Sequence, residues 1–146
     1  MKYIQLLTIL CTFIVTGCQS TQPRAEASEY FVTEGGGIMI DNSELNYAMT
    51  YKLIKNASAS IYAVVEFENP KPGGSPLVAK AILKNGAKKL LVQSPKFKGI
   101  RNNRSYSTIL RAYSDANHTN LITTHKQAIQ FSAPSVILKQ RGISEY

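Results

Sequence analysis

The chain has 146 residues, of which 44% are hydrophobic and 18% are charged, and its formal net charge is +8 at pH 7. These residues predict one domain of ordinary globular composition and leave no room for a second one of typical size. With only two cysteines the sequence also excludes a disulfide-rich scaffold.

Residues 1–17 have the order of a signal peptide. One lysine is followed by an almost wholly apolar run over residues 3–15, and then by a threonine and a glycine. The apolar run is shorter than the roughly 20 residues that a spanning helix needs. We expect cleavage after Gly17, which removes Lys2 and leaves a net charge of about +7.

The residues VTGC at positions 15–18 resemble the lipobox of bacterial lipoproteins, in which the cysteine is acylated and becomes the first residue. The resemblance implies lipidation of Cys18, palmitate among its acyl groups, and a membrane partner through this lipid anchor. The residue after the cysteine is Gln19 and not aspartate, which by the same resemblance implies an outer-membrane protein that faces the periplasm. The alternative is an ordinary secretory signal, or an uncleaved anchor, with an incidental cysteine.

Residues 18–28 are polar and contain Pro23, so we expect a lipidated tether there. The folded domain is expected over residues 29–132, followed by a C-terminal strand or tail over residues 133–146. The apolar segment SVILK at 135–139 is the candidate for that last strand. The glycines at 35–37 lack the lysine of a phosphate loop and indicate a bend or bulge in a strand.

Alternation of apolar and polar residues predicts strands over residues 45–53 and 61–68, which we expect to form an antiparallel hairpin. Residues 69–76 contain three prolines and two glycines and are predicted to be an exposed loop. Residues 75–86 have the caps of a short helix. Against the helix, Asn85-Gly86 lies between VAKAILK and AKKLLVQ as a type I′ hairpin turn would, and we favour strands.

A second hairpin is predicted from residues 105–114 and 121–131, on either side of the turn DANHTN. In its first strand one face carries Tyr106, Thr108, Leu110 and Ala112. In the second strand two alternate sets of residues compete for the buried face, which indicates an edge strand or a bulge.

The segment GIRNNRSYSTILRAYSD at 99–115 resembles the turn and penultimate strand of fibronectin type III and related immunoglobulin-like domains. Ile100 and Tyr106 have the spacing of a tyrosine corner, in which the tyrosine hydroxyl bonds to upstream backbone. The resemblance implies an all-β fold, a single immunoglobulin-like or fibronectin type III-like antiparallel β-sandwich.

Motifs of catalysis and metal binding are scarce. His118 and His125 lack further convergent ligands, and no nucleophile elbow surrounds any serine. Glu66 and Glu68 share one face of a strand, where such a pair is normally solvated. We therefore expect no enzyme activity, no metal and no cofactor.

Positive charge is concentrated between Glu68 and Asp115, where the chain has ten basic residues and no acidic one. Outward side chains of adjoining strands lie beside one another, so we expect these residues to share one side of the domain. The alternative is a solvated face that only confers solubility. The expected basic face consists of Lys84, Lys88, Lys89, Lys96, Lys98, Arg101 and Arg104.

These observations favour a non-catalytic protein-interaction module in the cell envelope, for example a secretion or envelope-complex subunit with a protein partner. The alternative is a binder of anionic polymers or lipid head groups through the basic face. Nucleic acid is not expected as a partner outside the cytoplasm.

Overall fold

The computed structural model of the protein describes residues 28–146. The expected signal peptide, Cys18 and the tether up to residue 27 lie outside the described residues. The described part folds into seven strands and one short helix. These elements are β1 (Phe31–Asp41), β2 (Glu44–Leu53), β3 (Ile61–Phe67), β4 (Leu77–Leu83), β5 (Lys89–Gln93), β6 (Arg104–Tyr113), β7 (Leu121–Phe131) and α1 (Ser135–Gln140).

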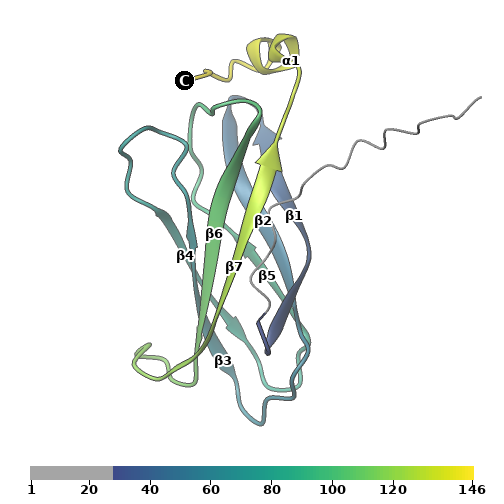
Figure 1. The fold of residues 1–146 in the computed structure, drawn as a ribbon, viewed down its shortest axis with the longest axis vertical. Helices are drawn as coiled ribbons and strands as arrows, with labels where there is room; N and C mark the ends of the chain where they lie inside the picture. The colour runs from purple at the N-terminus through teal and green to yellow at the C-terminus, as the bar shows by residue number, and fades with distance from the viewer. Residues whose placement is uncertain (1–27) are drawn as a thin grey trace, which may run out of the picture.

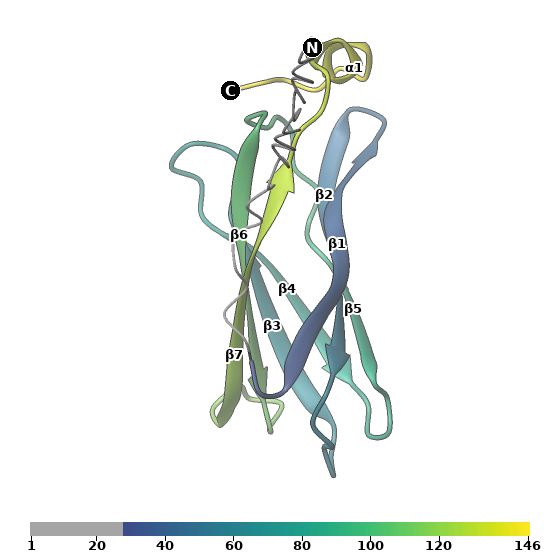
Figure 2. The same cartoon turned by 45° about the vertical axis from the view of Figure 1, so that its right-hand side comes forward.

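The strands form two antiparallel sheets, one in the order β1-β2-β5 and one in the order β4-β3-β6-β7. The sheets pack face to face in an elongated molecule (Figures 1 and 2). This arrangement confirms the prediction of a single all-β, immunoglobulin-like sandwich.

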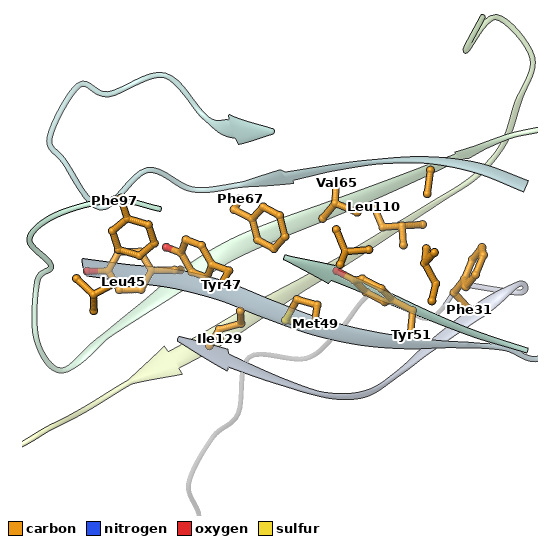
Figure 3. Packing of buried hydrophobic residues seen from close by; sticks show 14 of the residues in the cluster. Phe31, Leu45, Tyr47, Met49, Tyr51, Val65, Phe67, Phe97, Leu110 and Ile129 are labelled. Atoms are coloured by element: carbon orange, nitrogen blue, oxygen red, sulfur yellow. The ribbon is translucent and has the colours of Figure 1, made fainter. Parts of the chain in front are cut away.

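Alternation along the strands places one face of each sheet in the core. In β2 every second residue from Leu45 to Leu53 is buried, and β3 and β6 repeat this pattern. Tyr47 stacks on Phe67 with ring centroids 5.1 Å apart, in the centre of the cluster shown in Figure 3. Tyr47 and Tyr51 supply ring area to a core that contains no tryptophan.

The expected hairpin of residues 45–53 with 61–68 is wrong. β2 pairs with β1 and β5, whereas β3 pairs with β4 and β6, so the connection over residues 54–60 crosses from one sheet to the other. The crossing places the apolar face of β2 opposite the apolar face of β3, so that the two faces cover each other in one core. The predicted β6–β7 hairpin is confirmed, with a register shift between Ala112 and Tyr113.

Residues 77–83 are the strand that the sequence favoured, but Asn85-Gly86 does not form a type I′ hairpin turn. Such a turn needs a positive φ at both central residues, and of the two only Gly86 has one. The turn is closed by the Ala87 N–H, which donates to the Lys84 carbonyl at 3.0 Å. It leads from β4 in one sheet to β5 in the other.

The expected strand over residues 135–139 is also wrong, because this segment is α1. Leu138 is fully buried, and the chain beyond the helix buries Ile143. The end of the chain then pairs with Ile100 through a parallel bridge at Glu145, and the Ile100 N–H donates to the Ser144 carbonyl at 2.8 Å. Residues 133–146 therefore close one end of the sandwich and contribute Leu138 and Ile143 to its core.

Two local predictions are confirmed. The Tyr106 hydroxyl accepts a hydrogen bond from the Arg101 N–H at 2.8 Å and donates one to the Arg101 carbonyl at 2.7 Å, while Ile100 is buried, as a tyrosine corner requires. The glycine run in β1 follows a register shift between Thr33 and Gly35.

Different connections lie at the two ends of the elongated sandwich, and α1 lies at one of them (Figure 1). The end that contains Ser28 and the connections 54–60, 84–88 and 114–120 is called the N-terminal pole. Ser28 is placed there by a 3.1 Å hydrogen bond between its hydroxyl and that of Thr123. The opposite end, which contains the β1–β2 turn, the connections 68–76 and 94–103, and α1, is called the C-terminal pole.

Candidate functional site

A pocket of about 490 Å³ lies at the C-terminal pole, between the β3–β4 connection and the outer face of the four-stranded sheet. The connection projects sideways from the sandwich (Figure 1). Among the described residues, this pocket is the best candidate for a binding site. Its lining is formed by Glu66, Phe67, Glu68, Asn69, Pro70, Lys71, Pro72, Gly73, Gly74, Pro76, Arg101, Arg104, Ser107 and Ile109.

The wall of the pocket is the proline loop, residues 69–76, and Asn69 organises it. The Asn69 side-chain amide donates to the Ser75 carbonyl at 2.9 Å, and its carbonyl oxygen accepts from the Lys71 N–H at 3.0 Å. The Gly74 N–H donates to the Lys71 carbonyl at 2.9 Å. Three prolines and these internal bonds reduce the conformational freedom of the loop.

The floor of the pocket is organised around Glu68. Arg104 forms an ion pair with the Glu68 carboxylate at 2.5 Å. The backbone N–H and the hydroxyl of Ser107 both donate to its second oxygen, at 3.0 and 3.3 Å. The Tyr47 hydroxyl donates to the Glu68 carbonyl at 2.8 Å from inside the core. Each oxygen of the Glu68 carboxylate thus has a partner, and Glu68 holds Arg104 at the floor of the pocket.

Two further cations line the pocket without a charged partner among residues 28–146, Lys71 and Arg101. The backbone of Arg101 is fixed by the tyrosine corner, whereas Lys71 is carried by the proline loop. Glu66, the other acid of the lining, is neutralised by Arg111 at 2.6 Å. The pocket therefore has surplus positive charge beside the apolar surface of its prolines and Ile109.

The seven residues of the expected basic face do not form one group. Lys84, Lys88 and Lys89 lie at the N-terminal pole, and the other four lie at the C-terminal pole. Lys89 is paired with Lys52 near one end of β2, and Phe97 is paired with Leu45 near the other end. At the rise of an extended strand, Leu45 and Lys52 are about 23 Å apart. Outward side chains of neighbouring strands do lie side by side, but the seven residues come mostly from turns at opposite ends.

Acidic residues from outside the acid-free stretch neutralise much of this charge. Lys89 pairs with Glu34 at 2.7 Å, and Lys96 pairs with Asp41 at 2.9 Å and with Glu44 at 3.3 Å. The hydrogen bond to Asp41 is the main cause of a raised pKa of Lys96. Of the other predicted residues, Lys88 donates to the Asn56 side chain at 2.7 Å. Lys84, Lys98 and Arg101 form no ion pair among the described residues.

Sequence reasoning identified Arg101 and Arg104 but missed what brings them together. The sequence predicts a solvated carboxylate at Glu68, and Lys71 belongs to the acid-free stretch but not to the expected basic face. The available signal was the proline-rich composition of residues 69–76, which predicted the loop correctly. It could not show that the loop folds over Glu68 and beside Arg101.

Other chemistry in the described part is limited. Among residues 28–146, no three His, Cys, Asp or Glu side chains converge as a metal site requires. His118 lies in the β6–β7 turn against Tyr113, and His125 is buried in the core. No helix of this part has the length and hydropathy to span a bilayer.

No protein-family model matches the chain, and none of the curated proteins compared with it is similar.

Proposed function

We propose that this chain is a bacterial lipoprotein, held in the outer membrane by lipid on Cys18 and facing the periplasm. Its sandwich acts as a non-catalytic interaction module for a protein partner of the cell envelope, such as a subunit of a secretion or envelope complex. The lipobox resemblance of residues 15–18 supports the anchor. The rigid sandwich and its pocket support the interaction role.

The observation that carries the proposal is the position of the pocket. Ser28, where the described chain begins, contacts Thr123 at the N-terminal pole, opposite Ala112, whereas Arg104 lies at the other end of β6. Eight residues of extended strand separate Ala112 from Arg104, about 26 Å. An anchor on Cys18 therefore leaves the pocket directed away from its point of attachment and accessible to a partner in the periplasm.

The lining of the pocket defines the chemistry of that partner. Lys71 and Arg101 favour an acidic group, and the proline rings and Ile109 favour an apolar neighbour of that group. We therefore propose a partner that inserts an acidic segment with an adjacent apolar side chain.

The test is a pull-down from the envelope in mild detergent, with the lipidated full-length protein as bait. Wild type should retain a defined protein partner in 300 mM salt. Lys71→Glu combined with Arg101→Glu should reduce the yield of that partner at least tenfold. The double reversal Lys52→Glu and Lys139→Glu, on exposed residues outside the pocket, is the matched control and should retain the partner. Equal capture by wild type and the pocket variant would contradict the proposal.

Lys71 and Arg101, which have no acidic partner among the described residues, also favour a second candidate, the binding of an anionic polymer or lipid head group in the same pocket. The same pull-down distinguishes the two candidates. Binding to a polyanion falls steeply with salt because exposed charges are screened beyond about 8–10 Å. Capture of lipopolysaccharide at 50 mM salt, lost at 300 mM and without a protein partner, would replace the first candidate by the second.

A further inference from the structure

A row of apolar and aromatic side chains crosses the outer face of the four-stranded sheet at the N-terminal pole. Tyr62 of β3 is paired with Ile82 of β4 on one side and with Tyr113 of β6 on the other, and Tyr113 is paired with Leu121 of β7. The side chains of paired residues lie side by side on one face of a sheet. We call these four residues the tyrosine row.

The tyrosine row is exposed at both ends. Ile82 is 57% exposed and Leu121 is 54% exposed, whereas Tyr62 and Tyr113 between them are half-buried. The row therefore presents two aliphatic side chains and two rings with polar tips on the edge of the molecule. Tyrosine of this kind is enriched where a protein meets both apolar and aqueous surroundings, as at a membrane surface.

Basic residues border the row. Lys80 lies in the next row of the sheet, paired with Val64, and Lys84 follows β4 directly. Neither lysine forms an ion pair among residues 28–146. Arg111 in the same second row is neutralised by Glu66. Long lysine side chains can cover apolar surface while they hold the charge toward anionic head groups.

The chain enters the described part beside the row. Ser28 contacts Thr123, two residues along β7 from Leu121, which is about 7 Å of extended strand. Ten peptide steps separate Ser28 from Cys18, which is at most about 36 Å of chain. A lipid on Cys18 would keep the row close to the bilayer, at an effective concentration that makes weak contacts sufficient.

We propose that the tyrosine row, together with Lys80 and Lys84, rests on the surface of an anionic bilayer. This inference builds on the proposed lipid anchor and adds an orientation to it. Tyr62 and Glu68 are six residues apart on the strand that joins the row to the pocket, about 20 Å. The contact fixes the N-terminal pole at the membrane and leaves the pocket clear of it.

The experiment uses lipidated full-length protein in vesicles of phosphatidylcholine and phosphatidylglycerol. Lipid on Cys18 and removal of Cys11 with the signal peptide leave no free thiol, so single cysteines can be labelled with a fluorophore. Ile82→Cys and Leu121→Cys report the row. Val136→Cys on α1, a residue 59% exposed at the other pole, is the matched control. The measurement is quenching by lipids that carry a nitroxide on the head group.

We expect quenching at positions 82 and 121 to be at least threefold stronger than at position 136. The double reversal Lys80→Glu and Lys84→Glu should remove most of that difference, whereas Lys98→Glu with Arg141→Glu at the other pole should leave it unchanged. Equal quenching at all three positions would overturn the proposal. Self-quenching that rises with protein density, without quenching by the lipid, would also overturn it and would indicate a contact between two copies.

Flotation with the vesicles separates this result from the anchor itself. Protein that floats but shows no difference in quenching would support the anchor and contradict the proposed orientation. Protein that carries no lipid and does not float contradicts both.

Discussion

The hydroxyl of Tyr106 connects the core to the pocket. It makes two hydrogen bonds with the backbone of Arg101, whose side chain lines the pocket. Tyr106→Phe removes both bonds without a change in shape, so we expect a loss of about 1–2 kcal/mol in the free energy of unfolding. The urea midpoint measures it. Tyr62→Phe is the control, because Tyr62 lies half-buried on the outer face of the sheet and outside the core. Equal midpoints for the two variants would contradict the role of the corner.

His125 is a buried residue whose charge state depends on pH. Its Nε2 shares a 2.9 Å hydrogen bond with the Thr33 hydroxyl, its Nδ1 has no partner in the described part, and burial lowers its pKa from 6.5. The unfolded chain therefore takes up the proton first as the pH falls. Stability should be constant well above pH 6.5 and should decrease below it, by at most about 1.4 kcal/mol per pH unit.

Urea unfolding at pH 7.5 and pH 5.5 measures this effect. The midpoint of wild type should fall between the two values, and His125→Gln should show a smaller fall because it cannot be protonated. The same fall in both proteins would assign the pH dependence to other groups.

At the scale of elements, β1 contains a glycine that its packing requires. A Cβ added at Gly36 would lie 2.1 Å from the Met49 sulfur and 3.0 Å from the Ala48 carbonyl, whereas at Gly35 it would meet nothing within 4 Å. Gly36→Ala should therefore destabilise the fold by about 1–3 kcal/mol through overpacking. Gly35→Ala should leave stability unchanged or raise it slightly. Thermal unfolding of the pair tests this, and equal losses would show that the space around Gly36 is not limiting.

The sequence predicted most strands because period-2 alternation reports directly which face of a strand is buried. It does not report which strand lies next to which, so the sequence predicts one hairpin for β2 and β3 although they belong to different sheets. The C-terminal segment was missed for another reason. A short apolar run such as residues 135–139 has no decisive period, and only packing at the end of the sandwich, where Leu138 is buried, selects a helix.

At the scale of the whole molecule, charge in the sequence was a poor guide to charge in space. The acid-free stretch looks strongly basic, but the fold brings Glu34, Asp41 and Glu44 from earlier strands to its lysines. The cations that remain without an acidic partner in the described part lie at both ends of the sandwich. This distribution is why we assign separate roles to the two poles, the pocket at one and the tyrosine row at the other.

The roles that we propose for the two poles depend on the proposed anchor on Cys18, since it would decide which end of the sandwich is held near a membrane. The most direct measurement is incorporation of labelled palmitate into the protein expressed in a Gram-negative host, with wild type compared with Cys18→Ser. We expect label in wild type, with the mass of a chain cut before residue 18. Cys18→Ser should take up no label and should keep its leader. An unlabelled wild type, or label that persists in Cys18→Ser, would contradict the account.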